Sequence, residues 1–139
     1  MPSRTRKPNA PSYTVLGLKP DVAGEVITLL QDRLNALNDL ALPLKHVPWN
    51  VIRPHFIAMH TMLDPRVDAV RLMVDDLAER IATLGGSPVG MPGALVAQRS
   101  WDDYSIGRAD TNAHLAALDI VYNGRSTPTT STTTCAART

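Results

Sequence analysis

The stretch from His55 to Gly86 reads HFIAMHTMLDPRVDAVRLMVDDLAERIATLGG, and it decides the fold of the chain. Apolar residues recur along it at steps of three and four, which is the period of an α-helix. Two glycines at its end provide a stop signal. We therefore predict one long helix from His55 to about Leu84. Its buried stripe would consist of Ile57, Met59, Leu63, Val67, Val70, Val74, Leu77 and Ile81.

Polar residues on this helix follow a spacing that burial does not require. His60 and Asp64 are four residues apart, and so are Asp75 and Glu79. Residues at that spacing lie above one another on a helix. With a turn of about 100° per residue, all four side chains fall within a sector of about 100°. They therefore share one face.

A single chain cannot bring the two pairs together, because Asp64 and Asp75 lie roughly 16 Å apart along the helix axis. The pairs are symmetric, however, about a point near residues 69 and 70. A second copy of the helix, antiparallel about a two-fold axis, would place His60 beside Glu79 of the partner subunit. The same axis would place Asp64 beside Asp75 of the partner subunit. The spacing suggests two equivalent metal sites per dimer, with nitrogen and oxygen ligands that suit iron or manganese.

The same residues also have a plainer interpretation. Charged residues four apart commonly form a solvated helix face. Asp64 precedes Pro65, so it could instead cap a helix that begins at the proline. Spacing alone leaves the metal site and the solvated face both open.

Three stretches together resemble the Dps family, the DNA-binding proteins from starved cells, also called mini-ferritins. They are Trp49-Asn50 followed by FIAMHTMLD, then DDLAERIATLGG, then SWDDYSIGRADTNAHLAALDIVYNG. The resemblance covers about residues 13–124 and implies an all-α, ferritin-like four-helix bundle. It also implies a dodecameric shell with iron-oxidising sites between subunits. The catalytic iron ligands would be His60, Asp64, Asp75 and Glu79.

One ligand of the family pattern is absent. The family has a histidine immediately before the tryptophan, whereas this sequence has Pro48 before Trp49. Proline offers no atom to a metal ion, and His46 would point about 200° away from position 48 on a helix. The resemblance thus implies a ferroxidase with a reduced ligand set, weaker iron binding and slower oxidation. Whether the chain is an active enzyme stays open.

Composition narrows the remaining possibilities. The 139 residues make one domain, and 44% hydrophobic residues suffice for a core. The single cysteine excludes an intrachain disulfide and suits a reducing compartment. No apolar run reaches the roughly 18 residues of a membrane span. We expect a cytoplasmic protein without membrane contact, and the resemblance adds an association with the nucleoid.

Charge is unevenly distributed along the chain. Residues 21–124 hold all thirteen acidic side chains but only eight of the fourteen basic ones. Residues 1–12 contain Arg4, Arg6 and Lys7 and have little to bury, which predicts a basic disordered arm. Such an arm can contact phosphates, and the resemblance implies nonspecific DNA binding. A solvated tail is the alternative.

Two further long helices are predicted. The first runs from Asp21 to about Val47 and would kink or end near Leu42, because Pro43 and Pro48 interrupt its period. Residues 85–100 read as a long connection, and residues 101–104 as a short helical turn.

The last long helix is predicted from about Arg108 to Asn123, with His114 on its surface. Its inward side chains would be Leu115, Leu118, Ile120 and Val121.

The apolar pattern stops at Gly124. Residues 125–139 contain nine Ser or Thr and no amphipathic period, so we predict a disordered tail. The fourth helix that the resemblance implies is thus apparently missing. Three functions remain in view. They are a DNA-protecting mini-ferritin that oxidises and stores iron, a noncatalytic DNA-binding or scaffold protein, and a decayed, truncated product.

Overall fold

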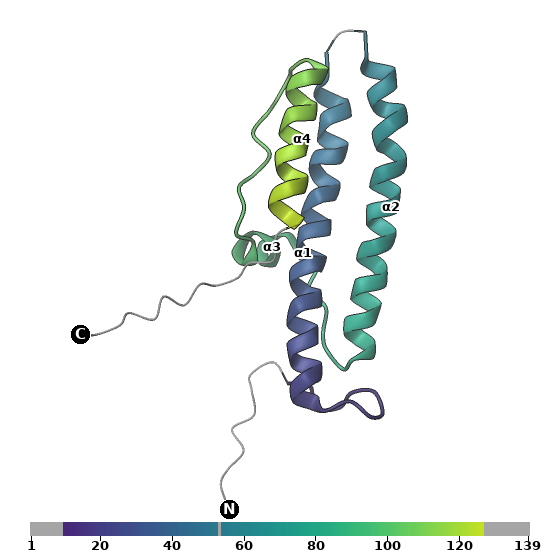
Figure 1. The fold of residues 1–139 in the computed structure, drawn as a ribbon, viewed down its shortest axis with the longest axis vertical. Coiled ribbons are helices and arrows are strands. Elements are labelled where there is room, and N and C mark those ends of the chain that lie inside the picture. The colour runs from purple at the N-terminus through teal and green to yellow at the C-terminus, as the bar shows by residue number, and fades with distance from the viewer. Residues whose placement is uncertain (1–9, 53, 127–139) are drawn as a thin grey trace, which may run out of the picture.

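The structure, a computed structural model, describes residues 10–52 and 54–126, the last two by their backbone only. These residues form α1 (Pro20–Asn50), α2 (Phe56–Thr83), α3 (Pro92–Gln98) and α4 (Thr111–Ser126). α1 and α2 are long and antiparallel, and α4 lies beside the half of α1 that leads into α2 (Figure 1). Within the described ranges the fold is all-α, as the periodicity predicted.

The core lies where the three long helices meet. Its buried residues come mainly from the second half of α1 and the first half of α2, and α4 contributes Leu118. The cluster consists of Leu40, Leu44, Val47, Val51, Met59, Leu63, Val67, Val70 and Leu118. Aliphatic packing of this kind is the main favourable contribution to folding. The polar face of α2 is left outside it.

The first helix continues where we predicted a kink or an end. α1 runs to Asn50 with Pro43 and Pro48 inside it. Each proline removes one backbone N–H from the helix. Both rings are buried, however, and Pro48 is among the most deeply buried side chains of the described residues. We attribute the uninterrupted helix to this packing, which offsets the lost hydrogen bonds.

The predicted bounds of the second helix are confirmed to within a residue at each end. Of its predicted buried stripe, Met59, Leu63, Val67, Val70 and Ile81 are buried, whereas Ile57 is 76% exposed and was wrongly included. α2 also passes through Pro65 without a break. It stops at Gly85, which has a φ of 88°. The Gly86 N–H donates to the carbonyl of Ile81 at 2.9 Å, and that of Gly85 donates to Ala82 at 3.0 Å. This pair of bonds is the Schellman ending that glycine favours.

The connection after α2 differs from the prediction. The short helix α3 lies inside residues 85–100, which we expected to be a plain connection, and residues 101–104 form no helical turn. Asp110 then starts α4 by accepting a hydrogen bond from the Ala113 N–H at 2.9 Å. Ala109 pairs with Val51 in an isolated parallel bridge, so the start of α4 is attached to the end of α1.

The predicted inward face of α4 is partly wrong. His114 is fully buried rather than on the surface, while Ile120 is 72% exposed and Leu115 is 42% exposed. Leu118 is buried and Val121 packs against the core, as predicted. Positions 114, 118 and 121 follow steps of four and three, so they form one stripe. Residues 115 and 120 lie outside that stripe.

Several predictions lie outside the described residues. The basic side chains Arg4, Arg6 and Lys7, the arm before residue 10 and the tail after residue 126 all belong to this group. Among the described residues, no helix is long and apolar enough to cross a membrane.

Candidate metal centre on the outer face of α2

His60 and Asp64 adjoin one another near the start of α2, as their spacing predicted. Nδ1 of His60 is 3.5 Å from Oδ2 of Asp64. The ring of Phe56, one turn earlier, contacts the imidazole with 4.5 Å between ring centroids. The His60 ring therefore lies between an aromatic side chain and a carboxylate, each one turn away along the helix.

The second ring nitrogen of His60 has no hydrogen-bond partner among the residues that the structure describes. Nε2 is screened from solvent and makes no hydrogen bond within residues 10–52 and 54–126. A buried polar atom without a partner is costly and calls for an explanation, of which a bound ion is one. Nε2 is thus the imidazole atom available to a metal ion.

Asp64 already has a cation beside it. Lys45 on α1 places Nζ 2.8 Å from Oδ1 of Asp64. The hydrogen bond from Lys45 lowers the pKa of the Asp64 carboxyl below its usual value, and His60 acts in the same direction. Asp64 therefore stays ionised, and its two oxygens face Lys45 and His60.

Asp75 and Glu79 lie further along α2, and both are exposed. Within the described part of the chain, no three His, Cys, Asp or Glu side chains come close enough together to hold a metal ion. The described structure thus places His60–Asp64 and Asp75–Glu79 as two separate pairs on one helix. A site formed by two subunits stays a prediction.

Pro48 occupies the position where the family resemblance implies a further histidine. His46 does not replace that histidine, because its Nε2 lies 2.9 Å from the carbonyl oxygen of Ile106. Ile106 belongs to the connection between α2 and α4, residues 84–110, which is called the crossover below. This contact agrees with the prediction that His46 is no ligand. The donor set available from α1 and α2 is therefore one imidazole and three carboxylates.

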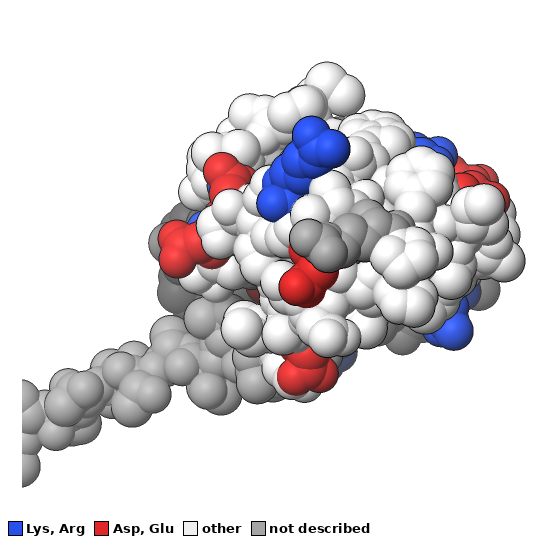
Figure 2. Space-filling model, turned by 90° about the horizontal axis from the view of Figure 1, so that it is seen from above, with Lys and Arg blue, Asp and Glu red and all other residues white. Residues whose placement is uncertain are grey.

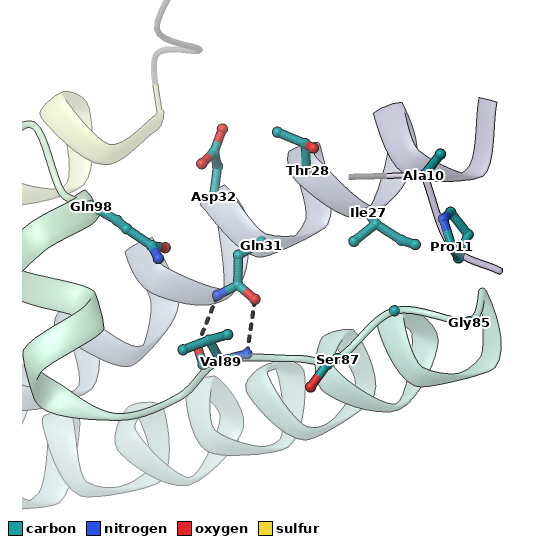
Figure 3. Close-up of a pocket in the computed structure, with 11 residues that line it drawn as sticks. Ala10, Pro11, Ile27, Thr28, Gln31, Asp32, Gly85, Ser87, Val89 and Gln98 are labelled. Atoms are coloured by element: carbon teal, nitrogen blue, oxygen red, sulfur yellow. Dashed lines mark hydrogen bonds between the residues drawn. The ribbon is translucent and has the colours of Figure 1, made fainter. Parts of the chain in front are cut away.

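A cavity of about 600 Å³ lies elsewhere, between the first half of α1 and the residues after α2 (Figure 3). In it, the side-chain amide of Gln31 donates to the carbonyl oxygen of Val89 at 2.8 Å and accepts from its N–H at 2.9 Å. Asp32 is the one charged side chain among the lining residues. The two Gln31 hydrogen bonds therefore fasten the residues after α2 to α1. Asp32 alone does not make up the ligand set of a metal ion.

A buried polar cluster was missed by the sequence reasoning. Asp39, inside the apolar part of α1, is 4% exposed. It accepts hydrogen bonds from Trp101 Nε1 at 2.6 Å and from Arg99 at 3.1 Å. Arg99 also pairs with Asp103. An aspartate among the apolar positions of α1 was the signal that the sequence offered. Through these contacts, Asp39 holds the crossover against α1.

The all-α fold agrees with comparisons to known proteins. A family model described as a ferritin-like domain matches residues 27–119. DpsA14 from Streptomyces coelicolor superposes with a TM-score of 0.82 and is 65% identical over 84% of this chain and 69% of its own. The chain belongs to the Dps family of ferritin-like proteins.

Other Dps-family proteins support this assignment. Dps from Mycobacterium smegmatis, in a tetragonal form, superposes with a TM-score of 0.80 at 56% identity, covering 82% of this chain and 70% of its own. The curated "DNA protection during starvation protein" of Mycolicibacterium smegmatis is 57% identical over 113 residues, or 81% of this chain. The chain spans 62% of the length of that relative.

Proposed function

We propose that this Dps-family chain binds ferrous iron and oxidises it at sites shared between two subunits. The observation that carries the proposal is the division of ligands on α2. His60 and Asp64 form one half-set and Asp75 and Glu79 form another on the same helix. A two-fold axis near residues 69 and 70 would bring each half-set beside the complementary half-set of the partner subunit. Two copies of the chain complete two sites, and one copy completes none.

The ligand chemistry fits iron as a substrate. Three carboxylates and one neutral imidazole provide the oxygen and nitrogen ligands that iron prefers. The negative charge of the carboxylates favours ferric over ferrous iron, which promotes loss of the electron. Each ferrous ion gives up one electron, and peroxide or oxygen accepts it. In a closed dodecamer, ferric product would be stored inside the shell.

DNA protection is the second part of the proposal, and the name of the Mycolicibacterium smegmatis relative supports it. On the end of the bundle in Figure 2, acidic and basic side chains lie scattered and form no broad basic surface. We assign DNA binding to the basic arm with Arg4, Arg6 and Lys7, through nonspecific contacts with phosphates, because this segment is basic and has little to bury. The proposed location is the cytoplasm, at the nucleoid.

The substitution at position 48 favours a second candidate function. Because Pro48 supplies no ligand, a noncatalytic DNA-binding assembly would keep the shell and lose iron oxidation. This candidate predicts salt-sensitive DNA binding without ferrous oxidation. A decayed product would show neither activity.

Subunit complementation tests the shared site directly. Asp64→Ala and Asp75→Ala variants are prepared separately, and each is expected to lose ferrous oxidation. When the two are unfolded and refolded together, mixed dimers contain one site with both substitutions and one intact site. Oxidation should therefore return in the mixture. Asp76→Asn changes a neighbouring carboxylate about 100° around the helix and should leave the activity unchanged.

The possible outcomes separate the candidates. Two inactive variants that do not complement each other would contradict a site shared between subunits. Full activity in Asp75→Ala would place iron oxidation elsewhere. An unsubstituted chain that forms the assembly and binds DNA but oxidises no iron would favour the noncatalytic function. Size-exclusion chromatography with light scattering shows whether the assembly has formed.

A further inference from the structure

A tyrosine and a histidine form a close pair away from the outer face of α2. Tyr104 lies in the extended segment before α4, and His114 lies in the first turns of α4. The Tyr104 hydroxyl is 2.8 Å from Nδ1 of His114. The two rings are nearly parallel, with 9° between their planes and 6.1 Å between their centroids. The candidate metal site uses neither residue.

The side chain of His114 is enclosed. Among the described residues, the contact with the Tyr104 hydroxyl is the one hydrogen bond of its imidazole ring. The side chain is 0% exposed, and its Nε2 has no hydrogen-bond partner within residues 10–52 and 54–126. If the imidazole served only to fill space, an apolar side chain of the same shape would replace it without the loss of a hydrogen bond. The arrangement instead dedicates one basic nitrogen to one phenol.

Tyr104 is held in its protonated form. Burial raises the pKa of its phenol, because the phenolate would lose solvation. The protonated phenol can therefore donate to Nδ1 of His114, which lies within hydrogen-bond distance. A phenol whose proton points at a base is arranged for transfer of that proton.

Oxidation of a phenol needs such a base. Removal of one electron turns the phenol into a strong acid, so its proton must leave with the electron. Solvent usually accepts that proton, but here the acceptor is already in place at 2.8 Å. His46 also contacts Tyr104, with its ring edge-on and 5.6 Å between centroids. Among the described residues, the hydroxyl of Tyr104 has its hydrogen-bond contact with His114, whereas His46 contacts the phenol ring and turns its Nε2 to the carbonyl of Ile106.

We propose that Tyr104 and His114 form a redox-active pair that donates one electron to a strong oxidant of the hydroxyl-radical class. The electron leaves the Tyr104 ring, and the hydroxyl proton passes to Nδ1 of His114. The products are a neutral tyrosyl radical, a protonated imidazole and hydroxide. A one-electron reductant reverses the step. The reduction of peroxide by ferrous iron is one source of such an oxidant. This source rests on the proposed function, whereas the redox activity of the Tyr104–His114 pair does not.

The surroundings favour a reversible step. Tyr104 lines a cavity of about 420 Å³ together with Trp101, Ile106, Ile120 and Val121, and His114 is not among its lining residues. A small oxidant can thus approach the phenol while the imidazole stays enclosed. Because Nε2 of His114 has no partner in the described part of the chain to receive a proton, the transferred proton remains beside the radical and returns on reduction.

The test uses an oxidant that needs no iron. A photo-oxidised ruthenium tris-bipyridine complex removes single electrons from the intact chain, and rapid freezing traps radicals for electron paramagnetic resonance. Tyr13 and Tyr122 are 68% and 42% exposed, so a Tyr13→Phe/Tyr122→Phe variant leaves Tyr104 as the only tyrosine. Deuterated tyrosine identifies the tyrosyl signal against tryptophan radicals.

We expect a tyrosyl signal in the Tyr13→Phe/Tyr122→Phe variant, with slower formation in deuterated water. In that background, His114→Gln keeps a hydrogen-bond acceptor but cannot take up a proton, so the radical yield should fall several-fold while circular dichroism shows an intact fold. His46→Phe is the matched control and should retain the yield.

Three results would overturn the proposal. They are absence of the Tyr104 signal when His114 is present, an equal yield in the folded His114→Gln variant, and a loss of yield in His46→Phe as large as that in His114→Gln. If His114→Gln does not fold, the solvent isotope effect with native His114 decides, and its absence counts against transfer of the proton. Failure of iron oxidation leaves this measurement unaffected.

Discussion

Lys45 on α1 and Asp64 on α2 are joined by a 2.8 Å contact, and Asp64 also adjoins His60. The lysine thus provides positive charge at the oxygen that a metal ion would approach. Because both side chains are partly exposed, this contact is a screened ion pair rather than a buried one. Its main effect is on the protonation and availability of Asp64.

Replacement of Lys45 by methionine should raise the pKa of Asp64 toward the usual carboxyl value, since the hydrogen bond that lowers it is removed. The stability that this pair provides is present above the usual carboxyl range and is lost as the pH falls through the lowered pKa of Asp64. Side-chain carboxyl NMR titration measures the change. An unchanged pKa of Asp64 would contradict the assigned cause. In the same variant, binding of Co²⁺ or Fe²⁺ at neutral pH should become tighter.

Pro48→His should increase the affinity for ferrous iron and the rate of its oxidation, because the family resemblance implies a histidine ligand at this position. We expect an increase of about tenfold or more, given that even indirect partners of ligands change affinity about 10- to 100-fold. Pro48→Ala is the control, since it restores the same backbone N–H without a ligand. Stopped-flow iron oxidation should separate the two variants, and equal rates would exclude position 48 from the site.

Asp39→Ala should destabilise the chain by about 1–3 kcal/mol, because Trp101 and Arg99 lose a buried acceptor. Arg99 keeps Asp103, which limits the cost. Urea unfolding followed by tryptophan fluorescence measures the free energy of unfolding. Asp32→Ala removes an exposed carboxylate from the same helix and should change stability by less than about 0.5 kcal/mol. Equal effects would show that the Asp39 cluster contributes little.

Gly85→Ala should destabilise the chain more than Gly17→Ala. Both glycines have positive φ, 88° and 86°, so each substitution pays a backbone cost of about 1–2 kcal/mol. A β-carbon at Gly85 would also collide with the backbone oxygen of Tyr13, whereas nothing lies within 4 Å at Gly17. Thermal unfolding measures the loss of stability in each variant, and the difference between the two losses gives the effect of the collision. A smaller effect at Gly85 than at Gly17 would rule it out.

The periodic parts of the fold were predictable from the sequence. α2 has an uninterrupted apolar stripe and a glycine stop, so its bounds and its polar face follow from local rules. The spacing on that one helix also predicted that His60 lies beside Asp64, which the structure shows. The meeting of the two half-sets across two subunits is still a prediction, because a single chain contains only the two separate halves.

The remaining features depend on contacts between distant segments. α1 continues through Pro43 and Pro48 because their rings are buried, and burial is not visible in local sequence. His114 turned inward because α4 packs with the stripe of 114, 118 and 121, which its apolar pattern did not distinguish from its neighbours. The contacts of Asp39 and of Tyr104 depend on the path of the crossover, which no periodicity specifies.

The uninterrupted passage of α1 through Pro48 has an evolutionary consequence. A helix that continues through proline at this depth keeps the same path whether proline or histidine occupies position 48. Selection for the shape of the proposed shell would therefore not detect the exchange, and selection for iron chemistry would. Chains with either residue could co-assemble, and a cell could then adjust its capacity for iron oxidation through the ratio of two interchangeable subunits.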